Sequence, residues 1–200
     1  MINPEQIAYH LTSRETKPNK EMKEKVLPFF LENNVRTVLD YGCGKFLRDS
    51  LYLSEKGFVV DALDLPEQIE RIDINLVKKI HFLSSELKEK KYDAVILNFV
   101  LQVLPTKKQR EEVLEDAILA VKKEGYIVLS LRNQSEINRH LIDGAVRYKD
   151  GLIMGDKNFK TFVKGYTKDE VKKIISDHDL KLIEFLRTYS SFISISKKLN

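Results

Sequence analysis

The chain has 200 residues, with 34 lysine and arginine side chains against 30 aspartates and glutamates and a single cysteine, Cys43. This length suits one α/β domain, and 42% hydrophobic with 32% charged residues is typical of a globular protein rather than a fibre or a disordered chain. No apolar stretch reaches the length of a membrane span, the N-terminus lacks a secretory-signal pattern, and one cysteine forms no internal disulfide, so we expect a cytoplasmic protein without a membrane partner.

A helix is predicted ahead of the first strand. Apolar residues recur at helical spacing over residues 22–30, and Asn19 is placed to cap the first turn. Because Pro28 has no backbone N–H, we expect it to kink this helix or to end it early.

Five short β-rich runs then alternate with helical patterns, which is typical of a doubly wound parallel sheet. The predicted strands lie at residues 37–41, 58–64, 80–83, 92–98 and 126–131. The helix before the last of them has a capping box, because Thr106 and Gln109 can each satisfy a backbone N–H of the other residue. We expect that helix to extend through Lys122 and Lys123 and to stop at Gly125.

The regular alternation is lost between residues 132 and 166, where glycines and polar residues predict an inserted loop or hairpin. A second capping box, Thr167 with Glu170, then begins a closing helix. Two strands follow at residues 180–186 and 191–196. Their short connection favours an antiparallel hairpin, because a parallel crossover needs about a dozen residues or more.

The most informative segment is residues 38–44 (VLDYGCG), which has the pattern of a buried strand that ends in two glycines ahead of a helix. Glycine has no Cβ, so the backbone at Gly42 and Gly44 allows a ligand to approach closely. Asp64 follows at the end of the next strand, where a carboxylate accepts hydrogen bonds from ribose hydroxyls. The pattern predicts a nucleoside-containing cofactor at the carboxyl edge of the sheet.

Charge at the turn distinguishes between cofactors. A dinucleotide presents a pyrophosphate, and its usual fingerprint has a third glycine, which is absent here. Asp40, two residues before the first glycine, would repel a pyrophosphate but suits a ligand that bears an amine. S-adenosylmethionine brings an α-ammonium and a sulfonium, so the acid favours this cofactor over NAD.

Residues 38–44 resemble motif I of the class I S-adenosylmethionine-dependent methyltransferases, and Asp64 resembles their ribose-binding acid. Residues 92–105 are similar to their motif IV with its following helix, and residues 125–130 to their fifth-strand region. The resemblance implies an α/β, doubly wound, Rossmann-like sheet of seven strands, mostly parallel with an antiparallel C-terminal strand beside the fifth, and helices on both faces. Three short pieces, residues 14–18, 98–105 and 131–133, carry a weaker resemblance to uncharacterised bacterial methyltransferases labelled as associated with DNA phosphorothioation.

By this resemblance, the methionine portion of the cofactor would lie at Asp40 and the glycine turn, with the reacting methyl beside Asn98. The ribose would lie at Asp64 and the adenine near residues 84–86. The cofactor-binding residues that the resemblance implies are Asp40, Tyr41, Gly42, Cys43, Gly44, Asp64, Leu65, Ser85, Glu86, Asn98 and Phe99. The chain departs from the family at Phe46, where members commonly have another glycine, and a ring there would narrow the turn or shift the helix.

We expect S-adenosylmethionine-dependent methyl transfer to a small-molecule acceptor, because the net charge of +4 is spread over mixed runs and no nucleic-acid-binding module is recognised. RNA or DNA is the alternative acceptor, and a cofactor-binding regulatory protein without turnover is the non-enzyme alternative. The substrate-side candidates are Arg132, just past the fifth strand, His140 in the irregular segment, and Asn98. No metal is expected to take part.

One methyltransferase domain is expected over residues 1–200. Its parts would be an N-terminal segment and helix (1–34), a cofactor-binding core (35–131), an inserted substrate-side loop or hairpin (132–166), and a closing helix and β-hairpin (167–200). The pattern predicts no particular oligomeric state.

Overall fold

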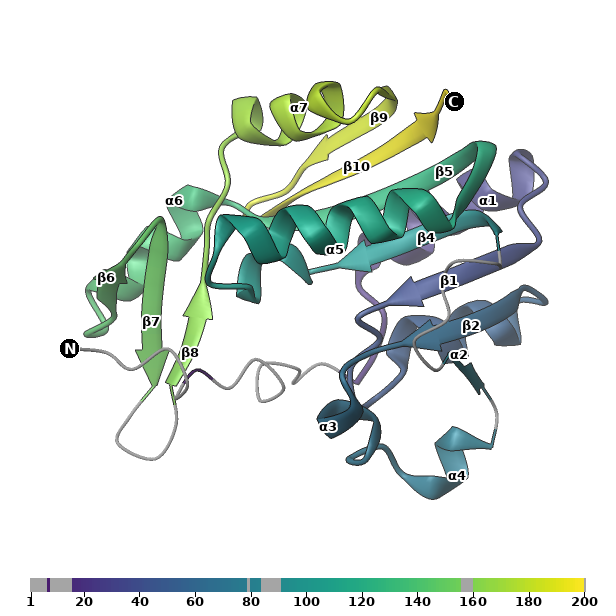
Figure 1. Ribbon diagram of the computed structural model, residues 1–200, viewed down its shortest axis with the longest axis horizontal. Coiled ribbons are helices and arrows are strands. Elements are labelled where there is room, and N and C mark those ends of the chain that lie inside the picture. Colours follow the sequence, from purple (N-terminus) through teal and green to yellow (C-terminus); the bar gives the residue numbers. More distant parts are fainter. Residues whose placement is uncertain (1–6, 8–15, 79, 84–90, 156–159, 200) are drawn as a thin grey trace.

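Seven strands form one sheet in the computed structural model, which describes residues 7, 16–78, 80–83, 91–155 and 160–199 (Figure 1). The strands are β1 (Thr37–Tyr41), β2 (Val59–Leu63), β3 (His81–Phe82), β4 (Tyr92–Asn98), β5 (Val121–Arg132), β9 (Leu180–Arg187) and β10 (Ser191–Lys198). Their order is β3-β2-β1-β4-β5-β10-β9. The first five pair in parallel, and β10 lies antiparallel between β5 and β9. The predicted Rossmann-like sheet with an antiparallel C-terminal strand is confirmed.

Helices cover both faces of this sheet (Figure 1). One face carries η3 (Met22–Val26), α1 (Leu27–Glu32) and α2 (Arg48–Glu55), and the other carries α5 (Lys107–Ala120) and α7 (Lys168–Asp177). Short helices in the connections are α3 (Pro66–Ile69), α4 (Ile74–Val77), η4 (Leu101–Val103), α6 (Gln134–Ile137) and η5 (Asn138–Leu141). Across the ranges that the structure describes, no helix is long and apolar enough to cross a membrane.

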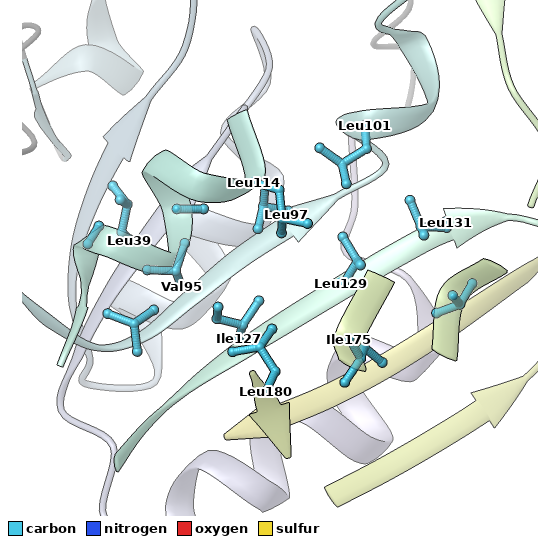
Figure 2. Close-up of a cluster of buried hydrophobic side chains, with 14 of the residues drawn as sticks. Leu39, Val95, Leu97, Leu101, Leu114, Ile127, Leu129, Leu131, Ile175 and Leu180 are labelled. Atoms are coloured by element: carbon cyan, nitrogen blue, oxygen red, sulfur yellow. The ribbon is translucent and has the colours of Figure 1, made fainter. Parts of the chain in front are cut away.

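The core lies on both sides of the sheet because side chains alternate along each strand. Figure 2 shows the cluster beneath α5 and α7, in which Leu97 and Leu129 of the strands pack with Leu114 and Ile175 of the helices. The neighbouring strand residue Ile96 packs in the second cluster, with η3, α1 and α2. Burial on both faces explains why the predicted strands are continuous apolar runs.

Both predicted capping boxes are confirmed. At the start of α5, the Gln109 backbone N–H donates to Thr106 Oγ1 at 3.1 Å, and the Thr106 N–H donates to Gln109 Oε1 at 3.1 Å. At the start of α7, the same exchange joins Thr167 and Glu170 at 3.2 and 2.7 Å. These bonds fix where the two helices begin on the α5/α7 face.

The predicted end of α5 is wrong. The helix ends at Ala120, and β5 begins at once with Val121, so Lys122 and Lys123 are in extended backbone. Strand pairing outweighs helix propensity here, because Val121 pairs with Tyr92 at the start of β4. Gly125 does not take the left-handed conformation that a helix stop requires.

Gly125 is instead required by a close approach between strands. A Cβ at Gly125 would lie 2.8 Å from the backbone oxygen of Asp93 and 2.7 Å from Val121 Cγ1. The adjacent residue, Glu124, has a φ of 63°. The register of β4 and β5 shifts at this point, so the glycine accommodates an irregular strand rather than a helix end.

The helix ahead of β1 begins as predicted, because Asn19 Oδ1 accepts from the Met22 N–H at 2.7 Å. It does not end at Pro28. The turns of η3 are π-helical, with the Leu27 N–H bonded to the Met22 oxygen, and α1 continues through Pro28 to Glu32. Proline lacks an N–H and its ring crowds the preceding turn, so the helix widens before it instead of stopping.

Residues after β5 form a second, smaller sheet. Its antiparallel strands are β6 (Val146–Tyr148), β7 (Gly151–Gly155) and β8 (Lys160–Val163), and they lie beyond the carboxyl ends of β4 and β5 (Figure 1). Backbone bonds tie this insertion to the main sheet: the Lys164 N–H donates to the Gln102 oxygen at 2.7 Å, and the Tyr166 N–H to the Arg132 oxygen at 2.8 Å. The insertion is therefore held at the carboxyl edge.

Candidate functional site

The site lies where the strand order reverses. The chain runs outward from β1 to β2 and β3 and then returns to β4 on the other side of β1, so connections leave the adjacent ends of β1 and β4 in opposite directions. Ligands of open α/β sheets bind in the crevice at such a switch point. The residues that follow β1 and β4 therefore line the candidate site.

A glycine turn follows β1. Gly42 and Gly44 have φ values of 79° and 67°, a region that other residues rarely adopt. A Cβ at Gly42 would lie 2.4 Å from Val100 Cγ2, so the turn passes directly against the segment that follows β4. Only glycine fits this contact, because the segments that follow β1 and β4 are packed together at Gly42 and Val100.

Asp64 lies against the glycine turn. Its Oδ2 accepts from the Gly44 N–H at 2.7 Å and its Oδ1 from the Leu65 N–H at 2.8 Å, while the Gly42 N–H bonds to the Leu63 oxygen at 2.7 Å. Burial raises the pKa of Asp64. The structure thus brings together two features that the sequence placed twenty residues apart.

After Gly44, the next residue with a left-handed backbone, which a glycine would adopt without strain, is Leu47 and not Phe46. Leu47 is fully buried directly before α2, with a φ of 49° and a ψ of 30°. Phe46 is half-buried, and the Lys45 ammonium lies 4.8 Å from its ring centroid. The turn thus keeps its left-handed step with a leucine, at a cost of about 1–2 kcal/mol in backbone strain.

Two buried carboxylates lie behind the turn. Asp40, at 2% exposure, accepts from Ser50 Oγ at 2.5 Å, and Asp49, in the first turn of α2, is 3% exposed. Burial, together with the nearby charge of Asp49, raises the pKa of Asp40 to about 7. This part of the candidate site thus holds two acidic side chains that are shielded from water.

A chain of side chains crosses from β5 to α2. Ser130 Oγ donates to Asn98 Oδ1 at 2.6 Å, and Asn98 Nδ2 donates to Asp49 Oδ2 at 2.9 Å. Arg48 Nε also donates to Asp49 Oδ2, at 3.2 Å, whereas Asp49 Oδ1 is buried and has no donor within the described part of the chain. The predicted site residue Asn98 therefore acts as a bridge inside the crevice.

The aromatic ring of Phe99 lies near two arginines, one of which, Arg48, also donates to Asp49. Phe99 has a φ of 64°, and its ring centroid lies 5.2 Å from Arg132 Cζ and 5.9 Å from Arg48 Cζ. A bulky residue in the left-handed region is strained, and strain of this kind is concentrated at functional sites. The structure places the predicted residues Phe99 and Arg132 in contact.

Glu136 joins the two substrate-side candidates from the segment after β5. Its Oε2 lies 4.0 Å from Arg132 Nη1, and its Oε1 lies 3.8 Å from His140 Nε2. Both are ion pairs beyond hydrogen-bond distance, and the buried Oε2 has no hydrogen-bond donor among the residues described. Glu136 was not predicted, and nothing in its sequence neighbourhood distinguishes it from an ordinary acid in a first helical turn.

The remaining predicted residues have different environments. Cys43 is buried, and burial raises the pKa of its thiol far above the usual range, which disfavours the thiolate that a nucleophile needs. Tyr41 is half-buried with a pKa raised by burial to about 12, and Leu65 is exposed. Ser85 and Glu86 lie outside the described residues. Within the described part of the chain, no group of three side chains is arranged to hold a metal ion.

A family described as a methyltransferase domain matches residues 14–184 of this chain. Curated proteins give no match. Solved structures do. A protein described as an S-adenosylmethionine-dependent methyltransferase from Methanosarcina mazei superposes with a TM-score of 0.64 and 19% identity, over 85% of this chain and 97% of that one.

Two further structures share the fold. The PH0226 protein from Pyrococcus horikoshii OT3 has a TM-score of 0.72 and 14% identity, over 98% of this chain and 96% of that one. The 1,6-didemethyltoxoflavin-N1-methyltransferase from Burkholderia thailandensis, solved with 1,6-didemethyltoxoflavin and S-adenosylhomocysteine, has a TM-score of 0.63 and 14% identity, over 90% and 79% of the two chains. At these identities the likeness shows the fold alone.

Proposed function

Because the chain belongs to the methyltransferase-domain family, we propose that it transfers a methyl group from S-adenosylmethionine to a small-molecule acceptor at the carboxyl edge of the sheet. S-adenosylmethionine is the cofactor, and it supplies a methyl group bound to a positively charged sulfur. The observation that carries the proposal is the pair of buried carboxylates, Asp40 and Asp49, behind a glycine turn that bonds to Asp64. The proposed location is the cytoplasm.

The residues present fit this cofactor. Asp49 Oδ1 is buried with no hydrogen-bond donor from the described residues, and the pKa of Asp40 is raised by burial and then by the negative charge of Asp49. A pyrophosphate would add negative charge there, whereas an ammonium and a sulfonium neutralise it. Asp40 and Asp49 would hold the methionine end of the cofactor, and Asp64 the ribose.

The acceptor side is formed by side chains from the ends of β4 and β5. Methyl transfer is an in-line displacement, so groups that orient the acceptor supply much of the rate acceleration. We assign that orienting role to Arg132, which lies against the Phe99 ring, and to Glu136 and His140, which are joined to Arg132 through Glu136. A guanidinium next to a carboxylate binds a small polar molecule in one orientation. The structure of the Burkholderia relative with bound 1,6-didemethyltoxoflavin supports a small-molecule acceptor.

Methyl-labelled S-adenosylmethionine tests the acceptor class directly. The protein is incubated with the labelled cofactor and with separate pools of metabolites, RNA, DNA and protein, and the label is followed into each. We expect label in the metabolite pool. Label only in RNA or DNA would replace the small-molecule acceptor with a nucleic acid. Cofactor binding without label in any pool would favour a regulatory protein that has lost turnover.

A further inference from the structure

Asp49 is a buried carboxylate whose two oxygens differ in their hydrogen bonding. Its Oδ2 accepts from Asn98 Nδ2 at 2.9 Å and from Arg48 Nε at 3.2 Å. Its Oδ1 is also buried, and it accepts from no group among the residues that the structure describes. A buried charged oxygen without a donor is costly, so this atom calls for a donor from outside the described residues, which a bound ligand can supply.

The neighbours of Asp49 hold this carboxylate in one orientation. The Ser130 hydroxyl donates to Asn98 Oδ1 at 2.6 Å, which directs the Asn98 amide N–H group toward Asp49. The chain therefore links β5, β4 and α2. Rotation of the Asp49 carboxylate would break its bonds to both Asn98 and Arg48, so these bonds hold Oδ1 in a fixed position.

Asp40 is less suited to this role. Its carboxyl accepts from the Ser50 hydroxyl at 2.5 Å, and its raised pKa of about 7 leaves it partly protonated at neutral pH. Asp49 accepts from two N–H donors, one of them on a guanidinium. The oxygen without a donor from the described residues therefore belongs to Asp49 on α2 and not to Asp40 on β1.

We propose that Asp49 Oδ1 accepts a hydrogen bond from the α-ammonium group of the cofactor, so that Asp49 selects ligands that carry an amino-acid amine. The inference rests on the proposed function, because it concerns the same cofactor. It adds a specific contact from α2, held through Asn98 and Ser130, that the glycine turn and Asp64 do not provide. A donor on the acceptor molecule is the competing occupant of this oxygen.

A binding cycle with two ligands and two proteins isolates this contact without knowledge of the acceptor. The ligands are S-adenosylhomocysteine and its deamino analogue, which keeps the adenosine, the sulfur and the carboxylate. The proteins are the wild type and Asp49→Asn, which keeps the side-chain shape and an acceptor for Asn98 and Arg48. Titration calorimetry gives four affinities, and their ratio measures the coupling between the amine and the carboxylate.

We expect Asp49→Asn to weaken S-adenosylhomocysteine binding roughly thirtyfold or more, the effect of removing one partner of a buried charged hydrogen bond. Binding of the deamino analogue should change less than about twofold. The matched control is Glu55→Gln, which removes a carboxylate from the exposed end of the same helix and should change neither affinity. Thermal unfolding without ligand checks that each variant is folded.

The outcomes separate the two proposals. If Asp49→Asn weakens both ligands equally, or neither, Asp49 does not contact the amine and the inference is overturned while the proposed function stands. If the wild type binds neither ligand, the proposed function itself fails. Should Asp49→Asn not fold, the wild type alone decides: the inference requires it to bind the deamino analogue at least about tenfold more weakly than S-adenosylhomocysteine.

Discussion

At the scale of single residues, Asp40 combines burial with a neighbouring carboxylate. Burial, and then Asp49, raises its pKa from 3.8 to about 7 in the folded protein, so between these pH values the folded chain holds a proton that the unfolded chain releases. The folded state binds more protons, and the free energy of unfolding falls as the pH rises from about 4 to 7. Above about pH 7, Asp40 is ionised in both the folded and the unfolded chain, and its effect on the free energy of unfolding no longer changes with pH.

Asp40→Asn should remove this dependence. The asparagine keeps an oxygen for Ser50 but carries no charge, so the variant is expected to be more stable than the wild type at pH 8, by up to a few kcal/mol. At pH 4 the two proteins should differ little. Urea unfolding at both pH values measures the difference. A variant that is destabilised equally at pH 4 and pH 8 would contradict the assigned protonation of Asp40.

Gly42 and Gly57 form a matched pair that tests the close packing at the glycine turn. Both have positive φ values, 79° and 90°, but a Cβ would meet Val100 Cγ2 at 2.4 Å at Gly42 and nothing within 4 Å at Gly57. Gly57→Ala should cost about 1–2 kcal/mol from backbone strain alone. Gly42→Ala should cost about 1–3 kcal/mol more. Equal losses in urea unfolding would show that Val100 does not press on the turn.

At the scale of elements, ion pairs with buried cations and partly exposed acids hold the insertion against α5 and α7. Arg110 of α5 pairs with Asp150, and Lys164 pairs with Glu170 of α7 at 2.8 Å and with Asp150 at 3.6 Å. The side chains of Arg110 and Lys164 are 8% and 10% exposed. These pairs surround a cavity of about 290 Å³ between α5 and α7, which Tyr166 also lines. They position the residues that follow β8, which hold the backbone of Arg132.

Lys164 and Lys173 test this arrangement, because each pairs with an acid but only Lys164 is buried. Lys164→Met leaves Asp150 and Glu170 without their shared cation, and should cost about 1–2 kcal/mol, since both acids remain partly hydrated. Lys173→Met removes an exposed pair on the same helix as Glu170 and should cost well under about 1 kcal/mol. Urea unfolding compares them. Equal effects would mean that the buried pairs do not anchor the insertion.

The whole molecule shows which features a sequence reveals. The parallel core, the two capping boxes and the closing hairpin depend on local patterns, and each was predictable. Gly44 and Asp64 were also predictable as one site, because a fixed spacing across one strand–helix–strand unit brings them together. The start of β5 could not be predicted, because pairing with β4 outweighs the local helical pattern.

The sequence does not single out two acids of the candidate site, Asp49 and Glu136, and the physical reason is different. Asp49 and Glu136 are acids in first helical turns, where favourable interaction with the helix dipole makes such residues common. That each has a buried oxygen without a hydrogen-bond donor from the described residues becomes visible only in the folded structure. Ser130 and Asn98 are 32 residues apart and meet only across two paired strands. Long-range contacts of this kind have no local pattern.

Equilibrium binding of S-adenosylmethionine to the wild-type protein tests the central claim, that the acidic crevice between β1 and β4 is built for a cationic nucleoside cofactor. A cation beside Asp40 lowers its pKa from about 7, so binding at pH 7 should release up to about half a proton per cofactor, measured by calorimetry in two buffers of different ionisation enthalpy. Saturable binding with proton release is the predicted result. No binding at millimolar cofactor, or binding with proton uptake, would contradict the account.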